Sequence, residues 1–254
     1  MKELTSKLAM MKVAIVTPTY NEAKNIGLLV KKLEKVCLGI PGTKFTVLVV
    51  DDNSPDGTAR VAKDLAKRVK AKNFSIRVLV RQKKEGVGKA YVHAFKEVLK
   101  EGFDYIIQID ADLSHNPKYV EALVEEAERG RDFVATSRYM KGGAILDWDF
   151  RRRLLSRGGN IYTRFFLGSK LTDYTNGLNM FSTDLLRQVN IDSLESGGYG
   201  FFIELKYTAL KHAKNFVQIP IVLTDRQHGQ SKLPKNTLVV NMLLVPRLRF
   251  SEKK

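Results

Sequence analysis

Cysteine, histidine and tryptophan are scarce in this chain. Of its 254 residues, one is cysteine, four are histidine and one is tryptophan. Cys37 cannot form an internal disulfide, and no CxxC motif or Cys/His cluster surrounds it. The sequence therefore argues against a secreted disulfide scaffold and gives no sign of a structural zinc site.

Long apolar segments are also missing. No run of about 18 apolar residues occurs, so we expect no bilayer-spanning helix, and the segment 1–11, a short N-terminal extension, lacks the apolar stretch of a signal peptide. Over 236–254 we expect an amphipathic tail, in which Leu238–Val245 either packs as a terminal helix or lies on a membrane surface. With 44% hydrophobic residues, the chain can still bury a substantial core and is not disordered.

Acidic residues are outnumbered by basic ones, 27 against 43, which gives a formal net charge of +16. Residues 1–137 carry 24 basic and 18 acidic side chains, whereas residues 138–254 carry 19 and 9. The excess in the second part favours an anionic partner there: a phosphate-bearing substrate, an acidic membrane surface or nucleic acid. Solubility or thermostability is the other explanation of such a composition.

Apolar strands and amphipathic helices alternate regularly along the first half of the chain. This pattern predicts an α/β fold with a mostly parallel, twisted sheet that helices cover on both faces, and ligands then bind beyond the carboxyl ends of the strands. We expect strands at Val13–Thr17, Phe45–Val50, Ile76–Val80, Tyr105–Ile109 and Phe133–Ser137, and helices at Asn25–Cys37, Thr58–Val69, Val87–Leu99 and Pro117–Arg129.

The second half is less periodic. Lys141–Asn160, with two glycine pairs, predicts a mobile loop followed by a short basic helix. A helix at Phe201–His212, a strand at Phe216–Leu223 and a polar loop at Thr224–Leu233 follow.

Asp110 and Asp112 are the most informative residues, because they end the fourth predicted strand. In an extended chain, residues i and i+2 point to one face, so the two carboxylates aim together while Ala111 points away. Carboxylates that close repel each other unless a proton or a metal lies between them. Mg²⁺ or Mn²⁺ shared with a phosphorylated substrate suits this arrangement. The alternative is a pair of solvated turn aspartates that cap the segment before Pro117.

Three other polar segments are candidates on the same rim. Asp51-Asp52 either accepts hydrogen bonds from a nucleoside or belongs to the turn that follows. Gly86–Ala90 matches neither a P-loop nor a dinucleotide motif, and either turns the N-terminus of a helix and Lys89 toward the ligand or is an ordinary loop. Arg226–Lys232 is a basic glycine loop that either binds phosphate or is solvated.

Arg151, Arg152 and Arg153, flanked by Trp148 and Phe150, have the make-up of an interfacial helix with an aromatic anchor and a basic face. A solvated helix face is the alternative.

As an ordered set, these motifs resemble a known family. Val-Thr-Pro-Thr-Tyr-Asn-Glu at 16–22, Val-Asp-Asp-Asn-Ser-Pro-Asp-Gly-Thr at 50–58 and Asp-Ala-Asp-Leu-Ser-His at 110–115 resemble the inverting family 2 glycosyltransferases. The segments 198–204 and 226–232 are similar to those of the polyprenol-phosphate sugar transferases, above all the dolichyl-phosphate mannose synthases. The resemblance runs from about Lys12 to Lys232.

The resemblance implies a nucleotide-sugar fold of the GT-A type at 12–235, with a nucleotide-sugar half (12–137) and an acceptor half (138–235). It implies catalytic roles for Asp110, Asp112, Arg138 and Arg226, of which the two aspartates would hold Mg²⁺ or Mn²⁺ and the diphosphate. The nucleotide sugar would also contact Pro18, Tyr20, Glu22, Asp51, Asp52, Lys89, Ala111, Arg226 and Lys232. The acceptor phosphate and the membrane surface would contact Arg138, Trp148, Arg152 and Arg153.

The reaction implied is transfer of mannose from GDP-mannose to dolichyl (polyprenyl) phosphate with inversion, by a metal-dependent enzyme on the cytosolic face of a membrane. Alternatives are a related transferase that uses UDP-glucose, another sugar nucleotide or a non-lipid acceptor, a nucleotidyltransferase, and a basic nucleic-acid-binding domain. The chain departs from the family pattern at Ser114, where many members have Gln, at Lys89, where many have Ser or Thr, and at Asn176–Asn179, where a family cation is lost.

Overall fold

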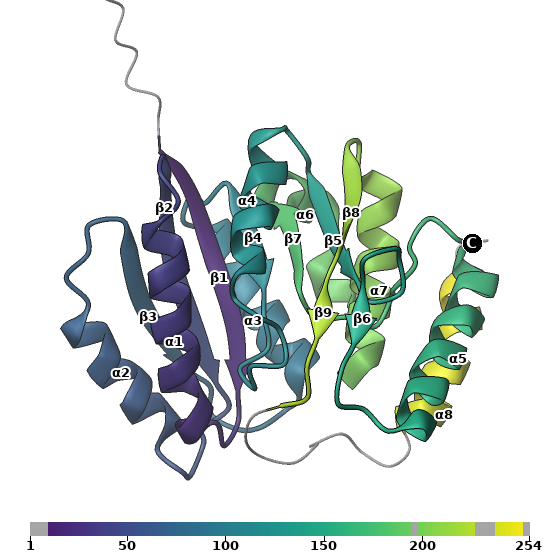
Figure 1. Ribbon diagram of the computed structural model, residues 1–254, viewed down its shortest axis with the longest axis horizontal. Coiled ribbons are helices and arrows are strands. Elements are labelled where there is room, and N and C mark those ends of the chain that lie inside the picture. The colour runs from purple at the N-terminus through teal and green to yellow at the C-terminus, as the bar shows by residue number, and fades with distance from the viewer. Residues whose placement is uncertain (1–9, 195–197, 227–236, 251–254) are drawn as a thin grey trace, which may run out of the picture.

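A seven-stranded sheet forms the centre of the molecule (Figure 1). The computed structural model describes residues 10–194, 198–226 and 237–250. The strands lie in the order β3-β2-β1-β4-β7-β5-β8, and β7 alone is antiparallel to its neighbours. Their bounds are β1 Met11–Thr19, β2 Thr43–Asp51, β3 Phe74–Val80, β4 Tyr105–Gln108, β5 Phe133–Ser137, β7 Asn179–Ser182 and β8 Phe216–Pro220.

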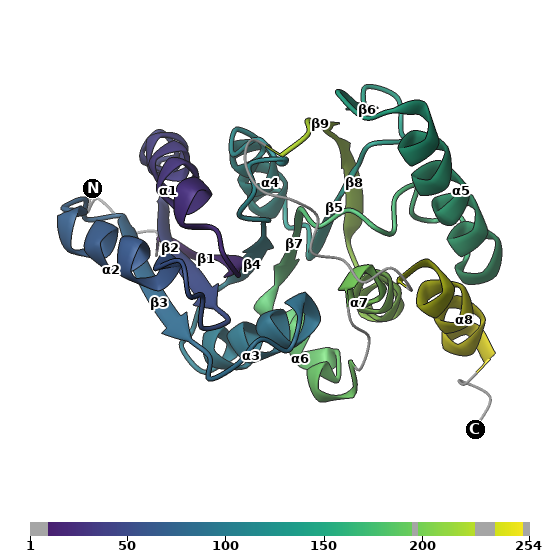
Figure 2. The ribbon, with the colours of Figure 1, turned by 90° about the horizontal axis from the view of Figure 1, so that it is seen from below.

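Helices cover both faces of the sheet. The central strands carry apolar side chains on each face, and both faces are buried against helices. Val13 and Ile15 of β1 pack with α1, α2 and α4, whereas Ala14 and Val16 pack with α3, α6 and α7. Figure 2 shows α4 and the pair α3 and α6 on opposite sides of the sheet. The helices are α1 Ala23–Leu38, α2 Thr58–Arg68, α3 Val87–Leu99, α4 Tyr119–Glu128, α5 Phe150–Leu167, α6 Thr183–Gln188, α7 Gly198–His212 and α8 Thr237–Phe250, with a 3₁₀ turn at Ile191–Ser193.

The predicted fold class is confirmed, and so are the five strands and four helices of the first half, with ends shifted by a few residues. In the second half, the helix expected at Phe201–His212 is confirmed as part of α7, whereas most of the loop expected at Thr224–Leu233 lies outside the described residues. Lys141–Asn160 contains the expected loop and the start of a basic helix, but the loop includes β6 (Ala144–Ile145) and the helix, α5, is longer than expected. α5 continues to Leu167 because Asn160, Thr163 and Leu167 bury one of its faces against the domain.

The predicted strand at Phe216–Leu223 is divided in two. β8 ends at Pro220, and β9 (Val222–Leu223) pairs with β6 in a separate two-stranded sheet. The backbone N–H of Val222 donates to the Tyr119 hydroxyl at 2.8 Å, which holds the chain away from the main sheet at this point. The division directs residues 224–226 along the edge where the parallel strands end.

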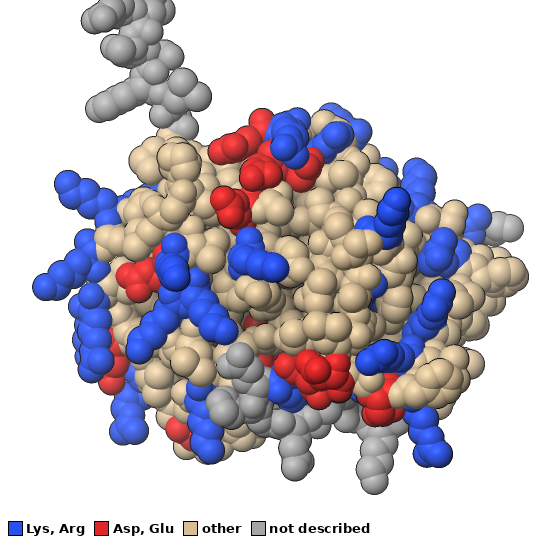
Figure 3. Space-filling model, viewed as in Figure 1, with Lys and Arg blue, Asp and Glu red and all other residues tan. Residues whose placement is uncertain are grey.

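α5 and α8 lie side by side at one end of the molecule (Figures 1 and 2). The Tyr162 hydroxyl of α5 donates to the Met242 carbonyl of α8 at 2.8 Å. Lys and Arg side chains stand out over α5 in the space-filling view (Figure 3). Within the described ranges, no helix is both long and apolar enough to cross a bilayer.

Candidate active site

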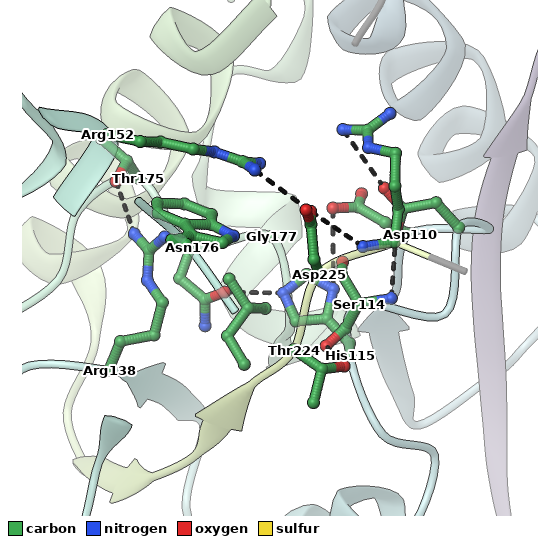
Figure 4. Close-up of a pocket in the computed structure, with 14 residues that line it drawn as sticks. Asp110, Ser114, His115, Arg138, Arg152, Thr175, Asn176, Gly177, Thr224 and Asp225 are labelled. Carbon is green, nitrogen blue, oxygen red and sulfur yellow. Dashed lines mark hydrogen bonds and ion pairs between the residues drawn. The ribbon is translucent and has the colours of Figure 1, made fainter. Parts of the chain in front are cut away.

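A pocket opens where the parallel strands end, because the sheet topology brings five segments to one edge. β4 and β5 deliver residues 110–115 and Arg138 from their carboxyl ends. β7 runs the other way, so the segment before it, 173–177, reaches the same edge. The pocket is lined by Asp110, Asp112, Ser114, His115, Arg138, Trp148, Arg152, Thr175, Asn176, Gly177, Leu223, Thr224, Asp225 and Arg226 (Figure 4).

The Asp110–Ser114 turn presents two carboxylates to this pocket. Leu113 has a φ of 64°, a left-handed conformation that is uncommon for residues other than glycine and that reverses the chain here. The Asp112 carboxylate accepts a hydrogen bond from the Ser114 N–H at 3.0 Å, and its other oxygen lies 3.6 Å from the Arg226 guanidinium. Ala111 is buried with α1 and α4, so its side chain points away, as predicted.

Gly177 lies directly against Asp110. A Cβ at position 177 would be 3.0 Å from one Asp110 carboxylate oxygen and 3.2 Å from the other. These contacts are tighter than most that real Cβ atoms make, so a side chain at position 177 would require the Asp110 carboxylate to shift by a few tenths of an ångström.

His115 forms the buried floor beneath Asp110. Its Nε2 lies 2.7 Å from the Asn176 side-chain oxygen, and because the Asn176 amide nitrogen faces Thr136, Nε2 is the donor. Its Nδ1 then faces Asp110 Oδ2 at 3.6 Å and has no hydrogen-bond partner within the described part of the chain. Asn176 thus fixes which edge of the imidazole faces the carboxylate.

The two carboxylates fit a divalent cation that substrate phosphates help to coordinate. Burial raises the pKa of Asp110; the His115 ring opposes this shift and the Asp112 carboxylate adds to it. A cation between the two groups would relieve this cost. The described residues contain no group of three or more His, Cys, Asp or Glu side chains placed to hold a metal. Mg²⁺ bound through one or two carboxylates plus phosphate oxygens needs no such group.

On the opposite side of the pocket, Arg138 is held by a buried carboxylate. Its Nε and Nη2 donate to the two oxygens of Asp173 at 2.6 and 2.8 Å, and Nη2 also reaches the Thr175 hydroxyl at 2.8 Å. Burial would raise the pKa of Asp173, but the Arg138 guanidinium outweighs it and holds this pKa at about 2. Such a bidentate pair fixes the plane of the guanidinium before any ligand binds.

Lys206 of α7 lies behind this pair and is fully buried. Its ammonium group donates to the Asp173 backbone carbonyl at 3.0 Å. Burial lowers the pKa of Lys206 to about 7, against the attraction of Asp173. Two cations, Arg138 and Lys206, and one anion, Asp173, are therefore buried together. Removing one member of such a group leaves a buried charge without its partner and destabilises the protein.

Trp148 and Arg152 form the outer wall. The Arg152 guanidinium stacks 3.8 Å from the Trp148 ring and pairs with Asp225 at 3.1 Å (Figure 4). Trp148 is only 9% exposed, so it is not the exposed aromatic anchor that we predicted; Leu146, before α5, and Phe150 of α5 are exposed instead. Arg153 is exposed and does not line the pocket.

The loops after β1 and β2 form a separate network of hydrogen bonds. Asp51 is buried and accepts from the Thr19 hydroxyl at 2.9 Å and from the N–H and hydroxyl of Ser54. Asp52 pairs with Arg81 at 2.7 Å. These contacts correspond to the turn-forming alternative, and both aspartates lie outside the pocket.

The remaining predicted donor residues also lie outside the pocket among described residues. Pro18 is half-buried in β1, Tyr20 has the Lys84 ammonium 4.2 Å from its ring centroid, and the Glu22 carboxylate accepts from Asn25. Lys89 is exposed in the first turn of α3. Lys232 lies outside the described residues.

Sequence reasoning missed Asp173, Lys206, Asn176 and Asp225 as parts of the site. A signal existed for three of them. Asp173 and Asn176 belong to the largely polar run Thr172–Gly177, and Lys206 is a lone cation in the largely apolar stretch Phe201–Leu210.

The sequence profile of the family described as "Glycosyl transferase family 2" matches residues 14–189, which include the Asp110–Ser114 turn and Arg138. The chain belongs to this family. It is a glycosyltransferase, and its architecture is a GT-A-like α/β fold.

Three curated relatives are similar over most of the chain. An undecaprenyl-phosphate mannosyltransferase of Micrococcus luteus is 38% identical over 223 residues, 88% of each chain. A polyprenol monophosphomannose synthase of Mycolicibacterium smegmatis is 35% identical over 86% of this chain and 80% of the relative. A dolichol-phosphate mannosyltransferase of Pyrococcus furiosus is 31% identical over 94% of this chain and 64% of the relative.

Solved structures share the fold at lower identity. Glucosyl-3-phosphoglycerate synthase of Mycobacterium tuberculosis, in complex with Mn²⁺ and UDP-glucose, superimposes with a TM-score of 0.65 at 20% identity, over 96% of this glycosyltransferase and 81% of that chain. Mannosyl-3-phosphoglycerate synthase of Rubrobacter xylanophilus gives a TM-score of 0.63 at 20% identity, over 94% and 72%.

Proposed function

We propose that this glycosyltransferase transfers mannose from GDP-mannose to the phosphate of a polyprenyl (dolichyl) phosphate, with inversion at the sugar. The single observation that supports the proposal is one pocket whose two sides carry opposite charges (Figure 4). Asp110 and Asp112 are on one side, and Arg138 and Arg152 are on the other. The names of the three curated relatives, all transferases or synthases of polyprenyl-linked mannose, support this choice of sugar and acceptor.

The carboxylate side would bind the donor. Asp110 and Asp112 would hold Mg²⁺ or Mn²⁺, which would neutralise charge on the departing diphosphate. Arg226, 3.6 Å from Asp112, would exchange this carboxylate for a phosphate oxygen. The nucleoside would lie toward Pro18, Tyr20, Glu22, Asp51 and Asp52, with Lys89, the Ala111 backbone and Lys232 as further contacts.

The arginine side would bind the acceptor. A phosphate monoester has a second pKa of about 6, so its oxygen is a nucleophile at neutral pH without a strong general base. This oxygen would attack the anomeric carbon and form the new C–O bond as the bond to the diphosphate breaks on the opposite face. GDP would leave with the electron pair. Arg138, preset by Asp173, and Arg152 would hold the acceptor oxygens in line.

The acceptor's isoprenoid chain requires contact with a membrane, which we place on the cytosolic leaflet. α5 and α8 together expose several large apolar side chains: Phe150, Leu154, Leu155, Ile161, Phe165, Val239, Val240, Met242, Leu243 and Phe250. Arg153 would lie at the lipid surface beside them. An exposed apolar face with cations at its border is typical of an interfacial helix.

The test incubates the purified protein with Mn²⁺ or Mg²⁺, polyprenyl phosphate in detergent and radiolabelled GDP-mannose, with UDP-glucose and GDP-glucose as matched alternative donors. We expect metal-dependent transfer of label to the organic phase from GDP-mannose, and none without the lipid phosphate. Transfer from UDP-glucose alone would replace the proposed donor. Absence of lipid-linked label with every donor and metal would overturn the proposal.

A further inference from the structure

A second cavity lies beside the active-site pocket, between α5 and the loop that follows β5. Its volume is about 310 Å³. Tyr139, Met140 and Gly143 of the loop line one side, and Arg157, Ile161 and Arg164 of α5 line the other. Arg138 lines both this cavity and the active-site pocket. None of the described residues that line the second cavity is acidic.

Two cations face this cavity without carboxylate partners. Arg157 and Arg164 are seven residues apart, so they lie on one face of α5 two turns from each other. Neither forms an ion pair among the described residues, and the Arg164 Nε is buried without a hydrogen-bond acceptor. The arginines of the active site differ, since Arg138 pairs with Asp173 and Arg152 with Asp225. The second cavity therefore offers an anionic ligand two cations, the exposed Arg157 and the half-buried Arg164.

The face of α5 next to these arginines is apolar and exposed. Phe150, Leu154, Ile161 and Phe165 are 77%, 59%, 57% and 82% exposed. Their spacing of four, seven and four residues places them along one stripe. α8 packs along a different side of α5 and leaves this stripe uncovered in the described structure. A ligand that matches both features has an anionic head group and apolar chains.

We propose that this cavity binds the phosphate head group of an anionic bilayer phospholipid, whose acyl chains lie along the Phe150–Phe165 stripe. Arg138 lines both cavities, but its guanidinium donates to Asp173 and Thr175. Arg157 and Arg164 are therefore the cations that would hold the phospholipid head group, beside the acceptor phosphate. This site would fix α5 at the lipid surface, so that the acceptor phosphate enters the active site from the membrane. The inference deepens the membrane contact of the proposed function and rests on it.

The experiment measures binding to vesicles that contain neither sugar nucleotide nor polyprenyl phosphate, so failure of the transfer reaction does not affect it. Vesicles of phosphatidylcholine with and without 30% phosphatidylglycerol are compared at 0.1 and 0.5 M NaCl, since 0.5 M salt screens diffuse attraction. The Arg157→Gln/Arg164→Gln variant is compared with Arg151→Gln/Lys170→Gln, which removes two exposed charges in or just after the same helix.

At 0.5 M NaCl we expect wild type and the control variant to keep about a tenfold preference for phosphatidylglycerol, and the cavity variant to lose it. Equal losses in both variants at both salt concentrations would overturn the proposal in favour of diffuse attraction. Arg157 is exposed, so Arg157→Gln alone carries the test, with a smaller loss, if the double variant does not fold.

A second arm titrates glycerol 3-phosphate and inorganic phosphate by calorimetry. Binding of these anions that depends on Arg157 and Arg164, together with vesicle binding that does not, would assign the cavity to a free phosphate and overturn the lipid assignment. The expected result is no saturable binding of either anion below millimolar concentrations.

Discussion

The two halves of the active-site rim differ in how their charges are paired. At the amino-terminal rim, formed by the loops after β1 and β2, Asp51 and Asp52 have short contacts with Thr19, Ser54 and Arg81. At the central rim, which surrounds the pocket, Arg226 and Asp112 are 3.6 Å apart and His115 Nδ1 has no hydrogen-bond partner among the described residues. One half forms a closed frame, and the other keeps charges that a ligand can engage.

This difference separates side chains that the protein holds in place from side chains that can change partners when a ligand binds. A side chain whose hydrogen bonds are all made within the protein contributes shape and stability. An arginine that lies beside a carboxylate at the pocket can exchange this carboxylate for a phosphate of the ligand. Arg138 combines the two, since Asp173 fixes it in place while it lines the pocket.

Asp112→Asn gives the largest expected effect. It removes one of two carboxylates that would hold the cation, and we expect mannosyl transfer to fall by about 10³-fold or more. The circular dichroism spectrum and melting temperature should change little. Asp51→Asn at the amino-terminal rim is the counterpart, and it should lower the melting temperature. Ordinary metal-dependent activity in Asp112→Asn would remove the distinction between the two rims.

Asp173→Asn should destabilise the protein by about 3–5 kcal/mol, because it leaves Arg138 and Lys206 buried without their anion. Denaturant unfolding measures this loss. Arg187→Gln, which breaks an exposed pair with Asp184, is the control and should cost about 0–1 kcal/mol. If Asp173→Asn loses no more free energy of unfolding than the control, the buried pair with Asp173 is not what fixes Arg138 in place.

Gly177→Ala should weaken metal-dependent donor binding by about tenfold, because the new methyl group would shift the Asp110 carboxylate by a few tenths of an ångström. Titration of GDP-mannose in the presence of Mn²⁺ measures it. Gly158→Ala in α5, where nothing lies within 4 Å of the added Cβ, should leave donor binding unchanged. An unchanged affinity in Gly177→Ala would show that the close approach does not matter.

Lys206 predicts a dependence of stability on pH. Its pKa is about 7 in the folded protein and lies near 10.5 when unperturbed, so the unfolded state binds more protons between these values. Stability should therefore rise with pH across this window, by up to about 1 kcal/mol per pH unit. Unfolding at pH 7.5 and 9 measures the slope, and Lys206→Met should have a smaller one. Equal slopes in the wild type and Lys206→Met would refute the lowered pKa of Lys206.

Local motifs predicted that Asp110 and Asp112 lie together, and non-local contacts formed what was missed. Both carboxylates line the pocket, although they lie in the turn after β4, which ends at Gln108, and not in an extended strand. The Arg138–Asp173 pair spans 35 residues and depends on the antiparallel insertion of β7, which no periodicity signalled. Trp148 was mistaken for an anchor because its burial depends on Arg138 and Arg152 packing at its ring.

The most direct test compares two pocket arginines, each of which forms an ion pair with an aspartate: Arg152 with Asp225 at 3.1 Å and Arg226 with Asp112 at 3.6 Å. The measurement is the KM for each substrate in mannosyl transfer by Arg152→Gln and Arg226→Gln. We predict that Arg152→Gln raises the KM for polyprenyl phosphate about tenfold and that Arg226→Gln raises the KM for GDP-mannose by a similar factor, each with little effect on the other substrate. If both variants raise the same KM, the pocket does not have separate donor and acceptor sides.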